Sequence, residues 1–143
     1  MCIRDRAEGE VLIFNDSRLK PDENAVMMFV EAVKNASSVT KGGNKMVWFF
    51  GDKGSQKQSF VENFSAVDRK FLIKIGMFCE QIDRYGGMTQ EIRTRWKMNG
   101  GAFSYLGTAV ASEIIKSGLS VEKRKSIVQS KLKLWKMYGD ERW

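Results

Sequence analysis

The stretch AFSYLGTAVASEIIKS, residues 102–117, decides the fold that the sequence predicts. Its large apolar side chains lie three or four residues apart, at Phe103, Leu106, Val110 and Ile114. This is the spacing of one face of an α-helix, and Gly118 follows as a helix-ending residue. We therefore expect a helix over residues 102–117. Its many small residues predict close packing, either inside a helical bundle or against a partner subunit.

Helical patterns flank this stretch on both sides. Ser65 is placed to cap a helix that runs to Gly86. Thr89 is placed to cap a shorter helix that carries Ile92 and Trp96. Ser120 opens a last helix, whose apolar residues share one face at Val121, Val128, Leu132 and Trp135. Four helices with short connections predict a compact bundle.

The N-terminal part predicts a small amount of sheet. Residues 10–14 are a short apolar run closed by a turn, which predicts a strand, and residues 22–35 have the spacing of an amphipathic helix. Residues 46–50 and 55–61 are typical of a β-hairpin around a glycine-containing turn. The expected fold class is therefore α+β and predominantly α, with a small N-terminal β-hairpin or sheet packed on a four- to five-helix bundle.

The first six residues need separate treatment. Met1-Cys2-Ile3-Arg4-Asp5 resembles the translation of a transposase adapter used in sequencing libraries, and Arg6 fits the next codon. We therefore interpret residues 1–6 as an adapter artefact and residues 7–143 as a single domain truncated at its N-terminus. Removing two positive charges and one negative charge takes the net charge from +7 to +6. Cys79 is then the only cysteine, which favours a reducing compartment, and we expect a cytoplasmic protein.

Most enzymatic sites lack the residues they need in this sequence. The chain has no histidine, which excludes His-dependent nucleophilic and proton-transfer chemistry and nearly all mixed-ligand zinc sites. Cys79 is expected to be a small buried hydrophobe, and the glycines at 51–55 lack P-loop spacing. Two Ser-x-x-Lys pairs, beginning at Ser120 and Ser130, have no companion motif. We expect no catalytic residue, metal or cofactor, although an enzyme built on scattered carboxylates would leave no motif.

The basic C-terminal third carries the strongest functional signal. Lys and Arg side chains neutralise phosphates, and an exposed Trp can stack on bases. The charge balance therefore predicts a non-enzymatic accessory protein that binds DNA or RNA through its C-terminal helices. The expected contact residues are Arg93, Arg95, Trp96, Lys97, Lys123, Arg124, Lys125, Lys131, Lys133 and Lys136. The alternative is an ordinary solvated surface, because the charges wrap more than half of the last helix.

Two other functions stay open. The first is a helical assembly or structural component, of the kind found in a phage or virus, that forms homo-oligomers or binds a protein partner. Its expected contacts are helix 102–117 and the C-terminal aromatic region, with Trp135, Met137, Tyr138 and Trp143. The second is the C-terminal part of a larger enzyme whose chemistry lies upstream. A membrane role is not expected, because the longest apolar runs, such as residues 46–50, are too short to cross a bilayer.

Overall fold

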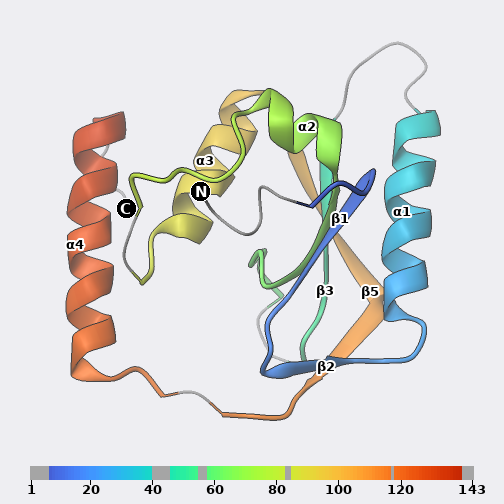
Figure 1. Cartoon of the computed structure of the whole chain (residues 1–143), viewed down its shortest axis with the longest axis horizontal. Coiled ribbons are helices and arrows are strands. Elements are labelled where there is room, and N and C mark those ends of the chain that lie inside the picture. Colours follow the sequence, from blue (N-terminus) through green and yellow to red (C-terminus); the bar gives the residue numbers. More distant parts are fainter. Residues whose placement is uncertain (1–6, 40–45, 55–57, 83–84, 117, 140–143) are drawn as a thin grey trace.

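The computed structural model describes residues 7–39, 46–54, 58–82, 85–116 and 118–139. The strands are β1 (Val11–Asn15), β2 (Leu19–Pro21), β3 (Val47–Asp52), β4 (Phe64–Asp68) and β5 (Ala102–Glu113). The helices are α1 (Ala25–Val39), α2 (Arg69–Lys74), α3 (Met88–Met98) and α4 (Val121–Tyr138). All of them are labelled in Figure 1. Of the residues that the structure describes, 40% are helical and 26% lie in strands, so the predicted helix-dominated bundle is wrong.

The five strands form one mixed sheet that curls into a nearly closed barrel. Their order is β1-β4-β3-β5-β2; β3 and β5 run parallel, and the other neighbours run antiparallel. The connection from β1 to β2 explains the curl. These strands are the two edges of the sheet, yet only residues 16–18 join them, and so few residues reach at most about 14 Å. The two edges must therefore approach each other.

Asp16 holds this short connection in place. Its carboxylate accepts hydrogen bonds from the backbone nitrogen of Arg18 at 2.9 Å and from the guanidinium Nε at 2.8 Å. The backbone nitrogen of Asp16 donates to the Asn63 carbonyl, just ahead of β4. The Arg18 hydrogen bonds keep the pKa of Asp16 well below its usual range. A charged turn thus joins the two edge strands of the nearly closed barrel.

Two apolar cores lie on opposite faces of the sheet. Alternate residues of β4 enter different cores, since Phe64 and Ala66 pack beneath α1 whereas Val67 packs toward α2 and α3. The α1 core is built around Phe29, with Phe64 edge-on at a centroid distance of 5.1 Å. The other core is larger and more aromatic. Its largest fully buried side chains are Trp48, Trp96, Met46, Leu72 and Ile92.

The predicted helix over residues 102–117 is wrong, because this stretch contains the longest strand that the structure describes. β5 pairs along β3 up to Gly51 opposite Leu106, and the next pair is Asp52 opposite Val110. This shift skips three residues of β5 and reverses which face later side chains occupy. Phe103 therefore packs toward α3, whereas Leu106 and Ala109 pack beneath α1. β5 is covered on both faces, so Phe103 and Leu106 are both apolar although they lie on opposite faces, and their three-residue spacing resembles that of a helix.

The predicted hairpin of residues 46–50 with 55–61 is also wrong. β3 pairs instead with β4, and residues 55–57 lie outside the described part of the chain. Ser65, the predicted helix cap, is buried within β4 and accepts a hydrogen bond from the Trp48 indole at 3.0 Å. The lack of a side chain at Gly51 in β3 leaves room for the Phe64 ring of β4, because a Cβ at position 51 would stand 2.3 Å from that ring.

Several elements agree with the sequence. The strand at residues 10–14 is confirmed as β1, the helix at 22–35 as α1, and the short helix that carries Ile92 and Trp96 as α3. The predicted cap at Thr89 is wrong, because the N-cap of α3 is Gly87 and the Thr89 hydroxyl donates to Glu62 instead. The long helix predicted from Ser65 to Gly86 shrinks to α2, which is capped by Asp68. It ends early because the chain turns back through Gly76 and Met77, which both have positive φ. Ser120 caps α4 as predicted, by accepting from the backbone nitrogen of Lys123.

Candidate interaction surface on helix α4

Helix α4 lies at the opposite end of the longest axis from α1, as Figure 1 shows. It meets the rest of the chain along the segment that leads into α3. The hydroxyls of Ser126 and Ser130 donate to the Tyr85 carbonyl, at 2.9 and 3.4 Å. The glycines beside Tyr85 leave room for the helix, because a Cβ at Gly87 would stand 2.7 Å from the Ser130 Cβ. The helix is therefore seated against this backbone segment through serine hydroxyls and through the apolar side chains of Ile127 and Leu134.

A buried carboxylate fastens the C-terminal end of α4. Glu91 of α3 is only 1% exposed and accepts a hydrogen bond from the Tyr138 hydroxyl at 2.6 Å. Arg95 donates to the same carboxylate from Nε at 2.7 Å and from Nη2 at 2.9 Å. Arg95 also donates to the carbonyls of Ile75 and Met77. One ion pair thus connects α3, α4 and the positive-φ turn that follows α2.

The environment of this cluster shifts two pKa values. Burial of Tyr138, followed by its hydrogen bond to Glu91, raises the pKa of the phenol to about 12. Burial alone would lower the pKa of Arg95, but the hydrogen bonds and the charge of Glu91 outweigh it and raise that pKa. Both groups therefore keep their protons across the physiological range, as fixed structural contacts do.

The apolar face predicted for the last helix exists, but it points to solvent. Ser130 and Leu134 are the buried residues of α4. Val121, Val128, Leu132 and Trp135 are between 43% and 62% exposed. At about 100° per residue, these four lie roughly two-fifths of a turn from the buried face. We call them the α4 stripe; it is an apolar surface that nothing in the described part of the chain covers.

Positive side chains border the α4 stripe on both sides. On the helical wheel, Arg124 and Lys131 lie along one edge, and Lys125 and Lys136 along the other. All four are exposed. Lys133 lies farther round the helix. Lys123 lies on the packed side, with its ammonium 5.3 Å from the centre of the Tyr85 ring. The α4 stripe thus separates the predicted cations of α4 into groups on different sides of the helix. A count of the charges in the sequence does not show this separation.

The predicted site residues of α3 are not brought together as a nucleic-acid surface. Trp96 is fully buried, and its indole donates to the Ala102 carbonyl at 2.9 Å, so its ring faces cannot stack on bases. Arg95 is committed to Glu91. Arg93 is half-buried, and Lys97 is exposed. The position of Trp96 four residues after Ile92, on one apolar face of the helix, was the sequence signal for its burial.

The side chains of the C-terminal aromatic region also differ in their exposure. Trp135 is exposed as part of the α4 stripe, and Met137 is exposed outside it. Tyr138 turns inward to Glu91, and Trp143 lies outside the described residues. Residues 102–113 of the range predicted to contact a partner form the interior strand β5 between β3 and β2, whereas Ile114 and Ile115 after it are exposed. Cys79 is a free, half-buried thiol rather than a buried one.

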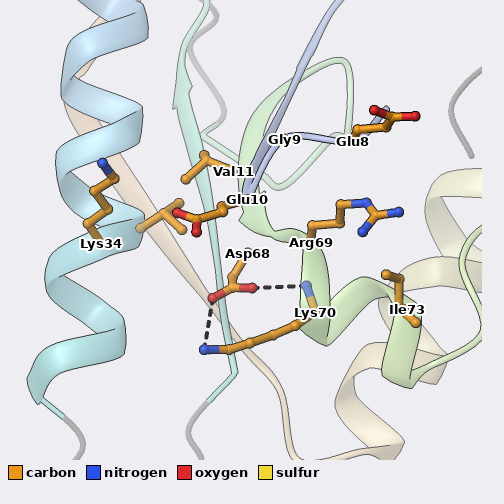
Figure 2. Close-up of a pocket in the computed structure, with 10 residues that line it drawn as sticks. Glu8, Gly9, Glu10, Val11, Lys34, Asp68, Arg69, Lys70 and Ile73 are labelled. Atoms are coloured by element: carbon orange, nitrogen blue, oxygen red, sulfur yellow. Dashed lines mark hydrogen bonds and ion pairs between the residues drawn. The ribbon is translucent and has the colours of Figure 1, made fainter. Parts of the chain in front are cut away.

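A cavity of about 470 Å³ lies at the edge of the sheet, where β1 and β4 meet α1 and α2. Figure 2 shows that Asp68 binds both the backbone nitrogen and the ammonium of Lys70, at 2.9 and 3.1 Å. The lining of the cavity has equal numbers of acidic and basic residues, namely Glu8, Glu10, Asp68, Lys34, Arg69 and Lys70. Asp68 already caps α2. The cavity therefore favours neither an anionic nor a cationic ligand.

Comparison with known proteins adds no functional assignment, since neither the models of protein families nor the curated proteins yield a match. Across the described ranges, no three Cys, Asp or Glu side chains are grouped to hold a metal ion. None of the helices described here has the length and apolar character needed to cross a bilayer. The α4 stripe is the feature that most needs a functional explanation.

Proposed function

We propose that this protein is a non-enzymatic, cytoplasmic assembly component that associates with other protein molecules through the α4 stripe. The observation that carries the proposal is the exposure of four large apolar side chains on one helical face. Single exposed apolar residues are ordinary on protein surfaces. A row of them along one helix is the pattern of a helix that docks its apolar face in a groove or against another helix.

Burial of the α4 stripe would contribute favourable free energy to association. Fully burying a large aliphatic or aromatic side chain contributes about 1.5–3 kcal/mol, and the α4 stripe offers four that are roughly half exposed. The other face of α4 is already held by Tyr138 and the two serine hydroxyls. The helix can therefore present the stripe without leaving its own domain, which limits the ordering cost of binding.

Sedimentation velocity over a range of protein concentrations tests this proposal. We expect a sedimenting mass above the 16.3 kDa of one chain that rises with concentration. The double change Val128→Ser, Leu132→Ser should return the protein to a monomer without altering its circular dichroism. Ile114→Ser, Ile115→Ser is the matched control, because these residues are equally exposed but lie outside α4. A strict monomer at all concentrations would contradict the proposal.

DNA or RNA binding is the second candidate. It is supported by the five exposed cations of α4, Arg124, Lys125, Lys131, Lys133 and Lys136, beside the single acidic residue Glu122. Trp96 and Arg95 have no part in it. Fluorescence anisotropy with labelled DNA and RNA oligonucleotides should then show affinity that falls steeply with salt, and each Lys→Ala change should reduce the salt slope by about one. Undetectable binding at low salt would remove this candidate.

A further inference from the structure

The outer face of α1 has the properties that a partner for the α4 stripe requires. Val26 and Met27 are 53% and 56% exposed, and Val30 beside them is half-buried. The exposed charged residues beside them are Glu23, Glu31 and Lys34, and on the helical wheel Lys34 lies between Val30 and Met27. We call these six residues the α1 face. It combines exposed apolar side chains with a net charge of −1, whereas the charged residues that border the α4 stripe are all positive.

We propose that the α4 stripe of one molecule docks on the α1 face of the next copy of the same chain. This inference rests on the proposed assembly function and names its partner. The charges support it: α4 carries six cations and one acid, whereas residues 22–36 carry three acids, at 22, 23 and 31, and one cation, Lys34. Apolar contact supplies the attraction, and the borders of opposite sign select the pairing.

The same charges disfavour symmetric pairing of two α4 helices. Both borders of the α4 stripe are positive, so two such stripes place cations opposite cations in either the parallel or the antiparallel orientation. Two α1 faces would similarly oppose Glu23 and Glu31. Contact between the α4 stripe of one copy and the α1 face of another is therefore favoured.

The position of the two faces determines the kind of assembly. α1 and α4 lie at opposite ends of the longest axis of the molecule (Figure 1). A copy that docks its α4 stripe on one neighbour and accepts a second neighbour on its α1 face makes heterologous contacts, and these leave one unused face at each end of any short chain of copies. The expected assembly is therefore a ring or a filament, rather than a closed two-fold dimer.

Charge reversal in pairs provides the decisive experiment. Lys125→Glu, Lys136→Glu makes one of the two borders of the α4 stripe acidic, and Glu23→Lys, Glu31→Lys makes the α1 face basic. Each variant alone should weaken self-association about tenfold or more, because reversed charges on one surface now repel like charges on the other. An equimolar mixture should restore association, since each face of one variant is then complementary to a face of the other. Lys74→Glu, Lys97→Glu is the matched control, with two exposed cations reversed outside both surfaces.

The outcomes separate this inference from the proposed function. Restored association in the mixture, with thermal melts that match the unchanged protein, supports α4–α1 docking. If the Val128→Ser, Leu132→Ser change abolishes association but the α1 variant does not, the assembly function stands and this inference is overturned. A strict monomer overturns both. The inference is likewise overturned if the protein is monomeric and α4 instead binds phosphatidylserine vesicles or an oligonucleotide.

Discussion

Helices α1 and α4 differ in what they do with their apolar residues. α1 buries Ala25, Phe29 and Val33 against the sheet, within a core that it shares with β4 and β5. α4 buries a narrow face against a glycine-containing segment and leaves its longest apolar row in solvent. Sequence periodicity looks alike in the two cases. The difference shows that an apolar row predicts a contact, but not whether the contact lies within the chain or between chains.

The largest expected effect is a difference in stability between a substitution in the buried apolar row of α1 and one in the α4 stripe. Phe29→Ala removes a fully buried ring and should lower the free energy of unfolding by about 3–5 kcal/mol. Leu132→Ala, in the exposed row of α4, should change it by less than about 0.5 kcal/mol. Chemical denaturation of dilute protein measures both. A similar loss for the two variants would show that the α4 stripe is covered within the monomer.

A glycine substitution tests how closely α4 is seated. Gly87 has a φ of 87°, and an added Cβ would stand 2.7 Å from Ser130. Gly87→Ala should therefore cost about 2 kcal/mol and increase hydrogen exchange along α4. Gly100→Ala is the matched control, because its φ is 80° but no atom lies within 4 Å of the added methyl group. Equal hydrogen exchange along α4 in the two variants would refute close seating.

Tyr138 tests the polar attachment of α4. Tyr138→Phe removes the hydrogen bond to buried Glu91 and should cost about 1.5 kcal/mol, whereas Tyr85→Phe at an exposed position should cost little. The raised pKa of about 12 favours the neutral phenol in the folded state. Its contribution to stability is therefore complete below pH 10, the ordinary tyrosine pKa, and is lost as the pH rises through about 12. Unfolding measured between pH 9 and 12 should decline less steeply in Tyr138→Phe; an identical decline would contradict this account.

A substitution in the α4 stripe should have the smallest effect on the free energy of unfolding but a clear effect on self-association. Trp135→Ser should leave the unfolding free energy of the monomer within about 0.5 kcal/mol, because the ring is 43% exposed. It should nevertheless weaken self-association, since aromatic residues contribute strongly at interfaces. Sedimentation equilibrium of this variant, compared with Met137→Ser on the same helix but outside the stripe, measures the contrast. Equal losses would mean that α4 has no defined docking face.

Local signals were sufficient wherever a segment's neighbours in sequence are also its neighbours in space. Ser120 and the residues after it identify the start of α4, and Glu91 to Trp96 have the pattern of α3. The amphipathic pattern of α1 and the apolar run of β1 are equally local. Among the candidate site residues, the exposed cations of α4 were located correctly on a helix. The roles of Trp96 and Arg95 were not, because both depend on segments far away in the chain.

What the sequence alone determined about this protein is therefore its basic charge, its lack of histidine and the amphipathic character of α1, α3 and α4. Only the tertiary structure decided that residues 102–113 form a strand. That outcome depends on pairing with β3, more than 50 residues earlier, and on the register shift at Asp52. Tertiary structure also decided which face of α4 is buried, because contacts with Tyr85, Gly87 and Glu91 bury the face with Ser130 and Leu134 and leave the α4 stripe in solvent. Periodicity reports that a face is apolar; only the packing of distant segments determines what covers it.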